Sequence, residues 1–172
     1  SKHKWISKKE LALLSPDLSE KDLIGGFRFS DGQMDDYKLG MWVAKQAKND
    51  GVEIIENTTV EKIDLDGNII INDRKQKYDY IINTCGPWAY KLLNNSGLKG
   101  NYKLDLIRGS HILLKGEPCQ PYFLQAENDD RIFFVLPYNG KTLIGTTEVR
   151  QNLSDPIIPS DEEIKYLIHE YN

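Results

Sequence analysis

The sequence predicts an α/β part followed by an antiparallel α+β part, and three observations support this fold class. Up to Gly97, stretches with helical periodicity alternate with short runs of β-branched residues. After Gly97, four β-rich runs follow one another, separated by turn-forming residues. Residues 161–172 then return to a helical pattern that opens with acidic side chains. We therefore expect two domains, residues 1–97 and residues 98–172.

The composition is that of a soluble globular protein. Of 172 residues, 40% are hydrophobic and 28% are charged, and the longest uninterrupted apolar run, residues 132–136, is far too short to cross a bilayer. A formal charge of −4 argues against general binding to nucleic acid. Cys85 and Cys119 have no CxxC spacing, which fits a reducing compartment and predicts no structural zinc or other metal site. We expect a soluble chain, and docking to a membrane surface stays open.

A strand and an amphipathic helix are expected early in the chain. Residues 1–22 indicate a helix end and a loop, and residues 24–30 indicate a strand on which Arg28 faces away from its phenylalanine neighbours. Asp35 and Asp36 stand before the helix, so we expect one of them to cap it and the other to favour its positive end. The apolar face of this helix comprises Leu39, Trp42, Val43 and Ala47.

Short β segments follow Gly51, where this helix should end. They comprise residues 52–55, 59–65, 68–72 and 77–82. The dipeptide Asp66-Gly67 predicts a two-residue hairpin turn, because it supplies the positive φ angles that such a turn needs.

The most unusual stretch is YIINTCGPW, residues 80–88. Residues 80–82 indicate a strand buried on both faces, because apolar residues follow one another without polar alternation. The Gly-Pro step after it cannot continue a ladder, and Pro87 suits the first turn of a helix over residues 88–95. In open α/β sheets such a juncture binds ligands with phosphates or π-systems. An ordinary strand-to-helix turn is the competing interpretation.

The second part contains four predicted strands and a closing helix. The strands comprise residues 102–115, 122–126, 131–136 and 143–149. An antiparallel meander is the economical arrangement for them. A helix should begin shortly after Pro159, with an apolar stripe of Ile164, Leu167, Ile168 and Tyr171.

Several strings occur together in an order and spacing that resemble a known family. They are FSDGQMDDYKL, INTCGPW, LIRGSHILL, YFLQAENDDRIFFVLPY, LIGTTEV and DEEIKYLIHEYN. Over residues 25–172 the chain resembles the flavin-dependent glycerol-3-phosphate dehydrogenases, within the amino-acid-oxidase-like flavoproteins. The resemblance implies part of a Rossmann-like FAD-binding domain, with a β-hairpin insertion, over residues 1–97. It implies an antiparallel-sheet substrate domain, with helices on one face, over residues 98–172.

Two departures from the family pattern concern the cofactor. The G-x-G-x-x-G motif that places the FAD pyrophosphate on a helix N-terminus has no counterpart, since Gly25-Gly26 is not followed by a third correctly spaced glycine. The Gly-rich segment expected after the substrate domain is missing as well. We therefore expect the sequence to be a central piece of a longer enzyme, and we expect the chain alone to retain no FAD.

The resemblance implies five contacts to FAD. Val60 stands where the family meets the adenine with backbone groups, although a core valine in a strand is the competing interpretation. Cys85 takes the place of Thr in the family's turn N-A-T-G-P-W, which lies along the cofactor, so a backbone contact is retained there and a hydroxyl contact is lost. The contacts that this turn implies come from Thr84, Cys85, Gly86 and Trp88.

The resemblance places the chemistry at R-G-S-H, where His111 is the candidate catalytic base. Oxidation of a secondary alcohol requires hydride transfer from carbon and removal of the hydroxyl proton, and an imidazole accepts that proton near neutral pH. Arg108 is the candidate for the substrate phosphate, because a guanidinium offers a planar fork to oxygen anions. A regular strand puts the two on opposite faces, so a shared ligand requires a bulge at Gly109; otherwise Arg108 is a solvated or ion-paired residue. The other implied substrate contacts are Ser110, Thr146 and Thr147.

The resemblance predicts oxidation of glycerol 3-phosphate to glycerone phosphate, with hydride transfer to flavin N5. The electrons are expected to pass to a quinone, which implies a cytoplasmic protein with a peripheral contact to the inner face of the cell membrane. An oxidase that passes electrons to oxygen, or an amino-acid-oxidase-like enzyme, has the same fold. A non-catalytic β-rich binding module would keep the sheet but would have no need of His111.

Overall fold

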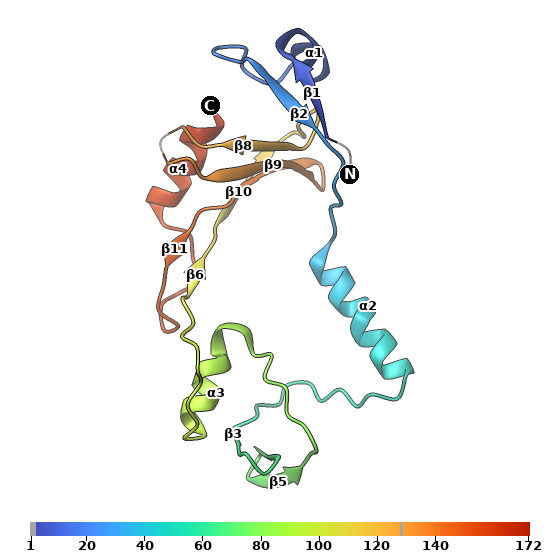
Figure 1. The fold of residues 1–172 in the computed structure, drawn as a ribbon, viewed down its shortest axis with the longest axis vertical. Coiled ribbons are helices and arrows are strands. Elements are labelled where there is room, and N and C mark those ends of the chain that lie inside the picture. Colours follow the sequence, from blue (N-terminus) through green and yellow to red (C-terminus); the bar gives the residue numbers. More distant parts are fainter. Residues whose placement is uncertain (1–2, 128) are drawn as a thin grey trace. The chain divides into compact units, whose positions relative to one another are not determined.

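The computed structural model describes residues 3–127 and 129–172. It consists of two units, one formed by Ser1–Asp31 with Leu106–Asn172 and the other by Gly32–Asp105 (Figure 1). One boundary between the units lies at residues 105–106. The N-terminal residues group with the antiparallel part. The loop after their helix is hydrogen-bonded there, with the Cys119 N–H donating to Asp17 Oδ2 at 3.0 Å.

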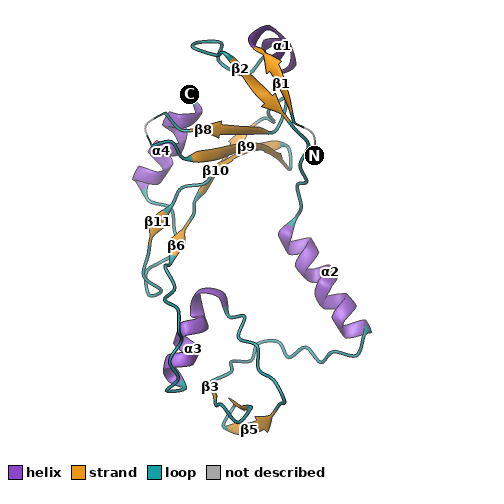
Figure 2. Ribbon diagram, viewed as in Figure 1, coloured by secondary structure: helices purple, strands orange, loops and turns teal. Residues whose placement is uncertain are grey.

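An antiparallel sheet of four strands forms the centre of the first unit. Its order is β7-β10-β9-β8, with bounds His111–Lys115, Lys141–Gly145, Ile132–Tyr138 and Tyr122–Gln125 (Figure 2). Strands β8, β9 and β10 form a meander, but β7 pairs with β10 and not with β8. The expected meander through all four runs is therefore wrong. The connection after β7 contains two prolines and is too long for a tight hairpin, so β7 is free to join the far edge.

Two of the predicted strands are interrupted. The run at residues 102–115 yields β6 (Ile107–Arg108) and then β7, with a break between them. The run at residues 143–149 likewise yields β10 and then β11 (Val149–Arg150). Strands β6 and β11 pair with each other as a separate ribbon, with Arg108 opposite Val149.

Helix α4 (Asp161–Tyr171) covers one face of the sheet and closes the core. The buried cluster comprises Ala126, Phe133, Val135, Ile144 and Leu167. The helix begins as the sequence predicts, with Ser160 as its cap. Of the predicted apolar stripe, however, only Leu167 is buried, while Ile168 and Tyr171 are more than 40% exposed.

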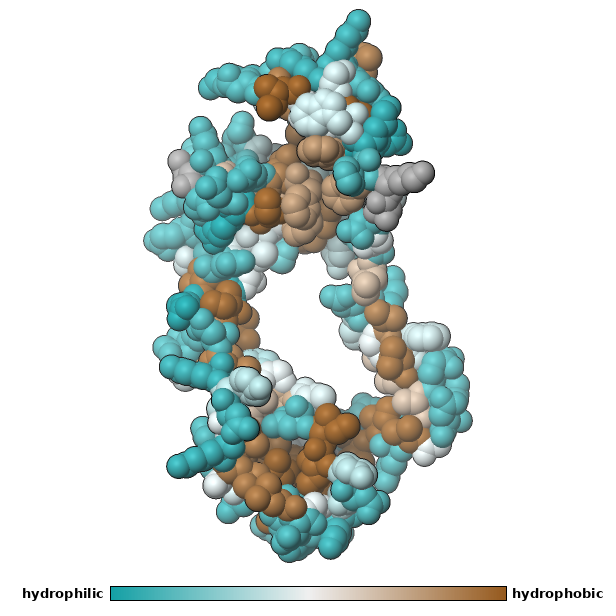
Figure 3. All heavy atoms as spheres, in the orientation of Figure 1, coloured by the Kyte–Doolittle hydropathy of each residue, from teal (hydrophilic) through white to brown (hydrophobic). Residues whose placement is uncertain are grey.

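The opposite face of the sheet is apolar and open. Alternate strand residues point to it, so that Leu113, Phe123 and Phe134 are exposed while their neighbours in each strand are half-buried or buried. The rings of Phe123 and Phe134 meet edge to face with centroids 4.8 Å apart. Exposed apolar side chains of this unit contribute to the brown surface in Figure 3.

The N-terminal residues form a small antiparallel ribbon with a helix. Strand β1 (Lys4–Ser7) pairs with β2 (Gly25–Arg28), and α1 (Lys8–Leu14) lies between them in sequence. The predicted strand at residues 24–30 is confirmed as β2. The strand β1 was not expected, because a basic and aromatic run of four residues has no clear period.

The second unit begins with α2 (Asp36–Asn49), and its predicted cap is confirmed. Asp35 accepts a hydrogen bond from the Lys38 N–H at 3.0 Å, and Asp36 lies in the first turn near the positive helix end. The helix ends before Gly51, which has a φ of +88°. Its apolar face is exposed and includes Leu39, Trp42 and Val43.

A three-stranded ribbon follows, made of β3 (Lys62–Ile63), β4 (Asn68–Ile71) and β5 (Arg74–Lys77). The hairpin at Asp66-Gly67 is confirmed, although its turn is longer than two residues. Asp64 closes it by accepting the N–H groups of Asp66 and Asn68. A second turn, which was not predicted, has positive φ at both residues, Asn72 and Asp73.

The strand expected at residues 80–82 is absent. Tyr80 is 89% exposed and Ile82 is 84% exposed, and no described segment pairs with them. A buried strand exists only where neighbouring strands satisfy its N–H and C=O groups, and residues 52–55 lack a strand for the same reason. The helix after the Gly-Pro step is confirmed as a short 3₁₀ turn, Gly86–Trp88, followed by α3 (Ala89–Asn95). Among the described helices, none is both long and apolar enough to cross a membrane.

Candidate functional site

The break between β6 and β7 places His111 at the start of a strand. Gly109 and Ser110 interrupt the ladder, as the sequence predicts, and His111 then pairs with Gly145 of β10. Its side chain lies over Gly145 so closely that a Cβ on that glycine would collide with the imidazole. Gly145 therefore provides the space that His111 occupies.

His111 lies on the open apolar face of the sheet, where it is exposed but partly desolvated by its neighbours. It alternates with the half-buried Ile112 and shares its face with Leu113. Burial lowers the pKa of His111 below its ordinary value of 6.5. The imidazole is therefore neutral near pH 7 and is able to accept a proton.

The guanidinium of Arg108 is bound to a carboxylate and is largely buried. It forms an ion pair with Glu163 of α4, and the two side chains are 14% and 5% exposed. Its Nε is buried and has no hydrogen-bond partner among the described residues. Because α4 lies on the covered side of the sheet, Arg108 and His111 serve different neighbours despite the break at Gly109. The contact of Arg108 with a substrate phosphate stays a prediction.

Glu163 accepts hydrogen bonds at both carboxylate oxygens. Thr147 donates its hydroxyl to Oε1 at 2.6 Å, and the Ser160 N–H donates to Oε2 at 2.9 Å. Burial alone would raise the pKa of Glu163, but the hydrogen bonds from Thr147 and Ser160 and the charge of Arg108 lower it to about 2. The carboxylate is therefore ionised at any physiological pH.

The predicted substrate residues Ser110, Thr146 and Thr147 lie together beside this pair. The Ser110 N–H donates to Thr147 Oγ1 at 2.9 Å, and the Thr147 N–H donates to the Ser110 carbonyl at 3.2 Å. Thr146 approaches Gly109 so closely that a Cβ there would collide with its hydroxyl oxygen. Ser110 and Thr147 are buried, so the site includes a dry polar cluster next to His111.

Sequence reasoning missed Glu163. The only available signal was the capping box formed with Ser160, which the structure contains. That pattern predicts a helix start and gives no sign that the same carboxylate is buried against another strand.

The five residues predicted to contact FAD all lie in the second unit. Thr84, Cys85, Gly86 and Trp88 are exposed, and Val60 is half-buried just before β3. Gly86 has a φ of +53°, and no atom lies within 4 Å of the position of a Cβ there. The turn is held from within, because Asn83 accepts the Cys85 N–H at 3.2 Å and donates to the Ala89 carbonyl at 3.1 Å. An uncovered backbone beside an exposed indole fits a ligand that binds along the turn.

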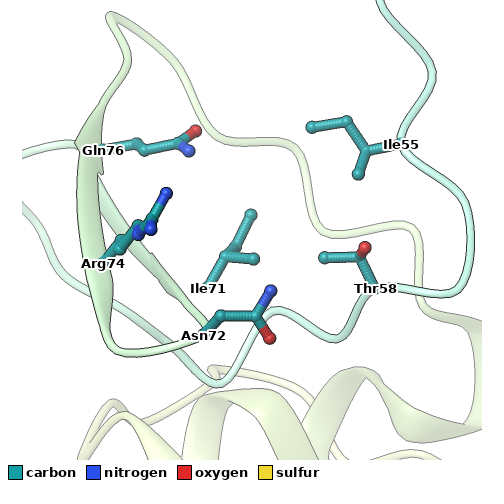
Figure 4. A pocket seen from close by; sticks show the side chains of 6 residues that line it. All are labelled: Ile55, Thr58, Ile71, Asn72, Arg74 and Gln76. Atoms are coloured by element: carbon teal, nitrogen blue, oxygen red, sulfur yellow. The ribbon is translucent and has the colours of Figure 1, made fainter.

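A separate cavity of about 400 Å³ lies in the second unit (Figure 4). Its lining residues come from the β4–β5 hairpin and the loop before β3, and they are Ile55, Thr58, Ile71, Asn72, Arg74 and Gln76. None of them is among the predicted site residues. We assign it no ligand.

Comparisons with known proteins agree on one family. The profile of the FAD dependent oxidoreductases matches residues 1–172. The aerobic glycerol-3-phosphate dehydrogenase of Staphylococcus aureus is 29% identical over 184 aligned positions, which cover 98% of this chain and 33% of that protein. The chain thus spans about a third of the length of this relative.

Solved structures show the same fold. The glycerol-3-phosphate dehydrogenase of Bacillus halodurans, solved as a complex with FAD, superposes with a TM-score of 0.86 at 24% identity, over 96% of this chain and 36% of that one. The glycine oxidase of Geobacillus kaustophilus superposes with a TM-score of 0.74 at 22% identity, over 98% of this chain and 45% of that one. The fold is therefore shared by enzymes with different substrates.

Proposed function

The chain belongs to the FAD dependent oxidoreductase family, and we propose that it is the central part of a flavin-dependent glycerol-3-phosphate dehydrogenase. The relatives from S. aureus and B. halodurans carry that activity in their names. One observation of this structure carries the proposal. The imidazole of His111, whose pKa is lowered, lies over Gly145 on an apolar face of the sheet that is open to solvent.

In the proposed reaction, His111 accepts the hydroxyl proton of glycerol 3-phosphate as a hydride leaves the same carbon. The C–H and O–H bonds break, a C=O bond forms, and glycerone phosphate is the product. Bound FAD supplies the hydride acceptor. The desolvation that lowers the pKa of His111 keeps the imidazole unprotonated near pH 7.

The two units receive different roles in this proposal. The second unit would hold FAD, mainly through backbone groups of Val60, Thr84, Cys85, Gly86 and Trp88. In the first unit, the segment around His111 would hold the substrate, with contacts from Arg108, Ser110, Thr146 and Thr147. Since Ser110 and Thr147 are buried, they act on the substrate through their backbone or by fixing their neighbours.

We further propose that the electrons pass from the reduced flavin to a quinone, with a peripheral contact to a membrane. The S. aureus relative is named a dehydrogenase and not an oxidase, which supports an acceptor other than oxygen. A quinone analogue and dissolved oxygen should be compared as oxidants of the reduced enzyme. Faster reoxidation by oxygen would identify an oxidase.

The substrate is tested by anaerobic reduction of the flavin in the complete enzyme. We expect glycerol 3-phosphate to bleach the flavin absorbance within a turnover, and glycine, proline and unphosphorylated glycerol to leave it oxidised. Bleaching by an amino acid but not by glycerol 3-phosphate would replace the proposal with an amino-acid-oxidase-like function.

A further inference from the structure

One carboxylate joins the two segments that hold His111, and we propose that Glu163 is a positioning residue for this base. The inference rests on the proposed function, because it assigns Glu163 a part in the same reaction. Glu163 does not touch the imidazole. It acts through the segment before His111 and through the segment that follows Gly145.

The first connection runs through Thr147. Glu163 Oε1 accepts the Thr147 hydroxyl at 2.6 Å, and Thr147 Oγ1 in turn accepts the Ser110 N–H at 2.9 Å. Ser110 directly precedes His111, and Thr147 lies two residues after Gly145, on which the imidazole rests. Two consecutive hydrogen bonds therefore lead from the carboxylate through Thr147 to the backbone N–H of the residue before the base.

The second connection runs through Arg108. Glu163 Oε2 binds its guanidinium and also accepts the Ser160 N–H, so the start of α4 is tied to β6. These side chains are buried from water, and the contacts are charge-assisted and therefore stiff. Capping alone requires only one oxygen of Glu163. The second oxygen is engaged with Thr147, which a cap does not need.

Precise placement matters because His111 has little freedom. The imidazole is in close contact with Gly145, and the strand that carries it begins immediately after Ser110. A displacement of about 1 Å in a reacting group costs on the order of a hundredfold in rate. Loss of the Glu163 carboxylate should therefore affect the rate through His111 although the two residues share no contact.

The test uses Glu163→Gln in the complete, FAD-loaded enzyme, with two controls. Glu162→Gln removes the same charge from an exposed neighbour on the same helical turn. Leu167→Ala removes a fully buried side chain of the hydrophobic core from the same helix, so it lowers stability without removing a hydrogen bond or the ion pair of Glu163. We expect Glu163→Gln to slow flavin reduction at saturating glycerol 3-phosphate by about 10- to 100-fold with normal FAD content. Both controls should stay within about twofold of the parent.

The pH profile separates positioning from a purely structural role. In Glu163→Gln, the apparent pKa of the base in kcat/KM should move toward that of an exposed imidazole, because His111 leaves its position over Gly145. The profile of Leu167→Ala should not move. If Glu163→Gln lowers stability yet keeps the parent rate and pH profile, Glu163 is a capping residue only and the inference is wrong.

Two further measurements keep the test decisive. If Glu163→Gln does not fold, Thr147→Val breaks the first connection while leaving the ion pair, and it should give the same kinetic change. If the parent enzyme does not oxidise glycerol 3-phosphate, the proposed function fails on its own. NMR titration of His111 in Glu163→Gln and Glu162→Gln then tests the positioning without any substrate, and equal titration curves would overturn it.

Discussion

At the scale of single residues, the proposed site depends on one neutral imidazole and on a glycine that leaves room for it. His111 needs no large pKa shift to act as a base, and burial moves its pKa in the direction that keeps it unprotonated. Gly145 has a buried backbone, and its missing side chain is a steric requirement of the histidine. Two predictions follow from this pairing.

The first concerns the base itself. His111→Ala should lower kcat for glycerol 3-phosphate by a factor of about 10² to 10⁴, as expected for the loss of a general base. The FAD content of the variant should be unchanged. His169→Ala is the matched control, because His169 is an exposed histidine on α4. In the parent enzyme, kcat/KM should fall as the pH drops through the lowered pKa of His111, because the protonated form cannot accept a proton. An alanine variant with parental turnover would contradict the assignment.

The second concerns the glycine. Gly145→Ala should displace the imidazole and lower kcat by on the order of a hundredfold, because the new Cβ would occupy the space of the ring. Gly40→Ala is a suitable control, since a Cβ there meets no described atom and the residue lies within helix α2. Steady-state kinetics with both variants is the measurement. Equal rates for the two would show that His111 tolerates a shift.

At the scale of elements, the buried ion pair ties helix α4 to the β6–β11 ribbon. Removing one partner of such a pair leaves an uncompensated charge in a dry environment, which costs roughly 3 kcal/mol. The ribbon itself has only two residue pairs, so its own hydrogen bonds contribute little. The attachment of the ribbon to the helix therefore depends largely on Glu163 and its partners.

This attachment should make the free energy of unfolding depend on pH in the acidic range. The folded pKa of Glu163 is about 2, below its ordinary value of 4.5, so the unfolded chain binds the proton more readily. The stabilisation is fully present above about pH 4.5 and is lost as the pH falls toward 2. Urea denaturation between pH 2 and 6 should show this slope in the parent chain and a flatter one in Glu163→Gln. Identical slopes would mean that other carboxylates dominate acid unfolding.

At the scale of the whole chain, the residues proposed to hold FAD lie in one unit and those proposed to hold the substrate lie in the other. Four of the FAD residues are exposed along one turn, and the fifth, Val60, is half-buried in an extended segment. We predict that the 172-residue chain, purified alone, is folded but colourless. Each tenfold increase in affinity for FAD requires about 1.4 kcal/mol of binding free energy. A few exposed backbone contacts provide little of this binding free energy. Flavin absorbance after dialysis measures this, and stoichiometric FAD would contradict it.

The sequence by itself determined the local features of this protein, and the tertiary structure decided how distant segments pair. Four local features follow from neighbouring residues, because side chains and allowed φ angles act within a few positions of the chain. They are the cap at Asp35, the helix start at Ser160, the turn at Asp66-Gly67 and the break at Gly109. The family resemblance added His111 and its neighbours.

Local sequence patterns could not predict three other features. They are the pairing of β7 with β10, the missing strand at residues 80–82 and the burial of Glu163. A strand forms only where another strand satisfies its backbone, and a carboxylate is buried only where Arg108 and Thr147 meet it. Such partners lie far away in the chain, with Arg108 being 55 residues from Glu163. Local sequence patterns carry no information about partners so far apart in the chain, so only the tertiary structure identifies them.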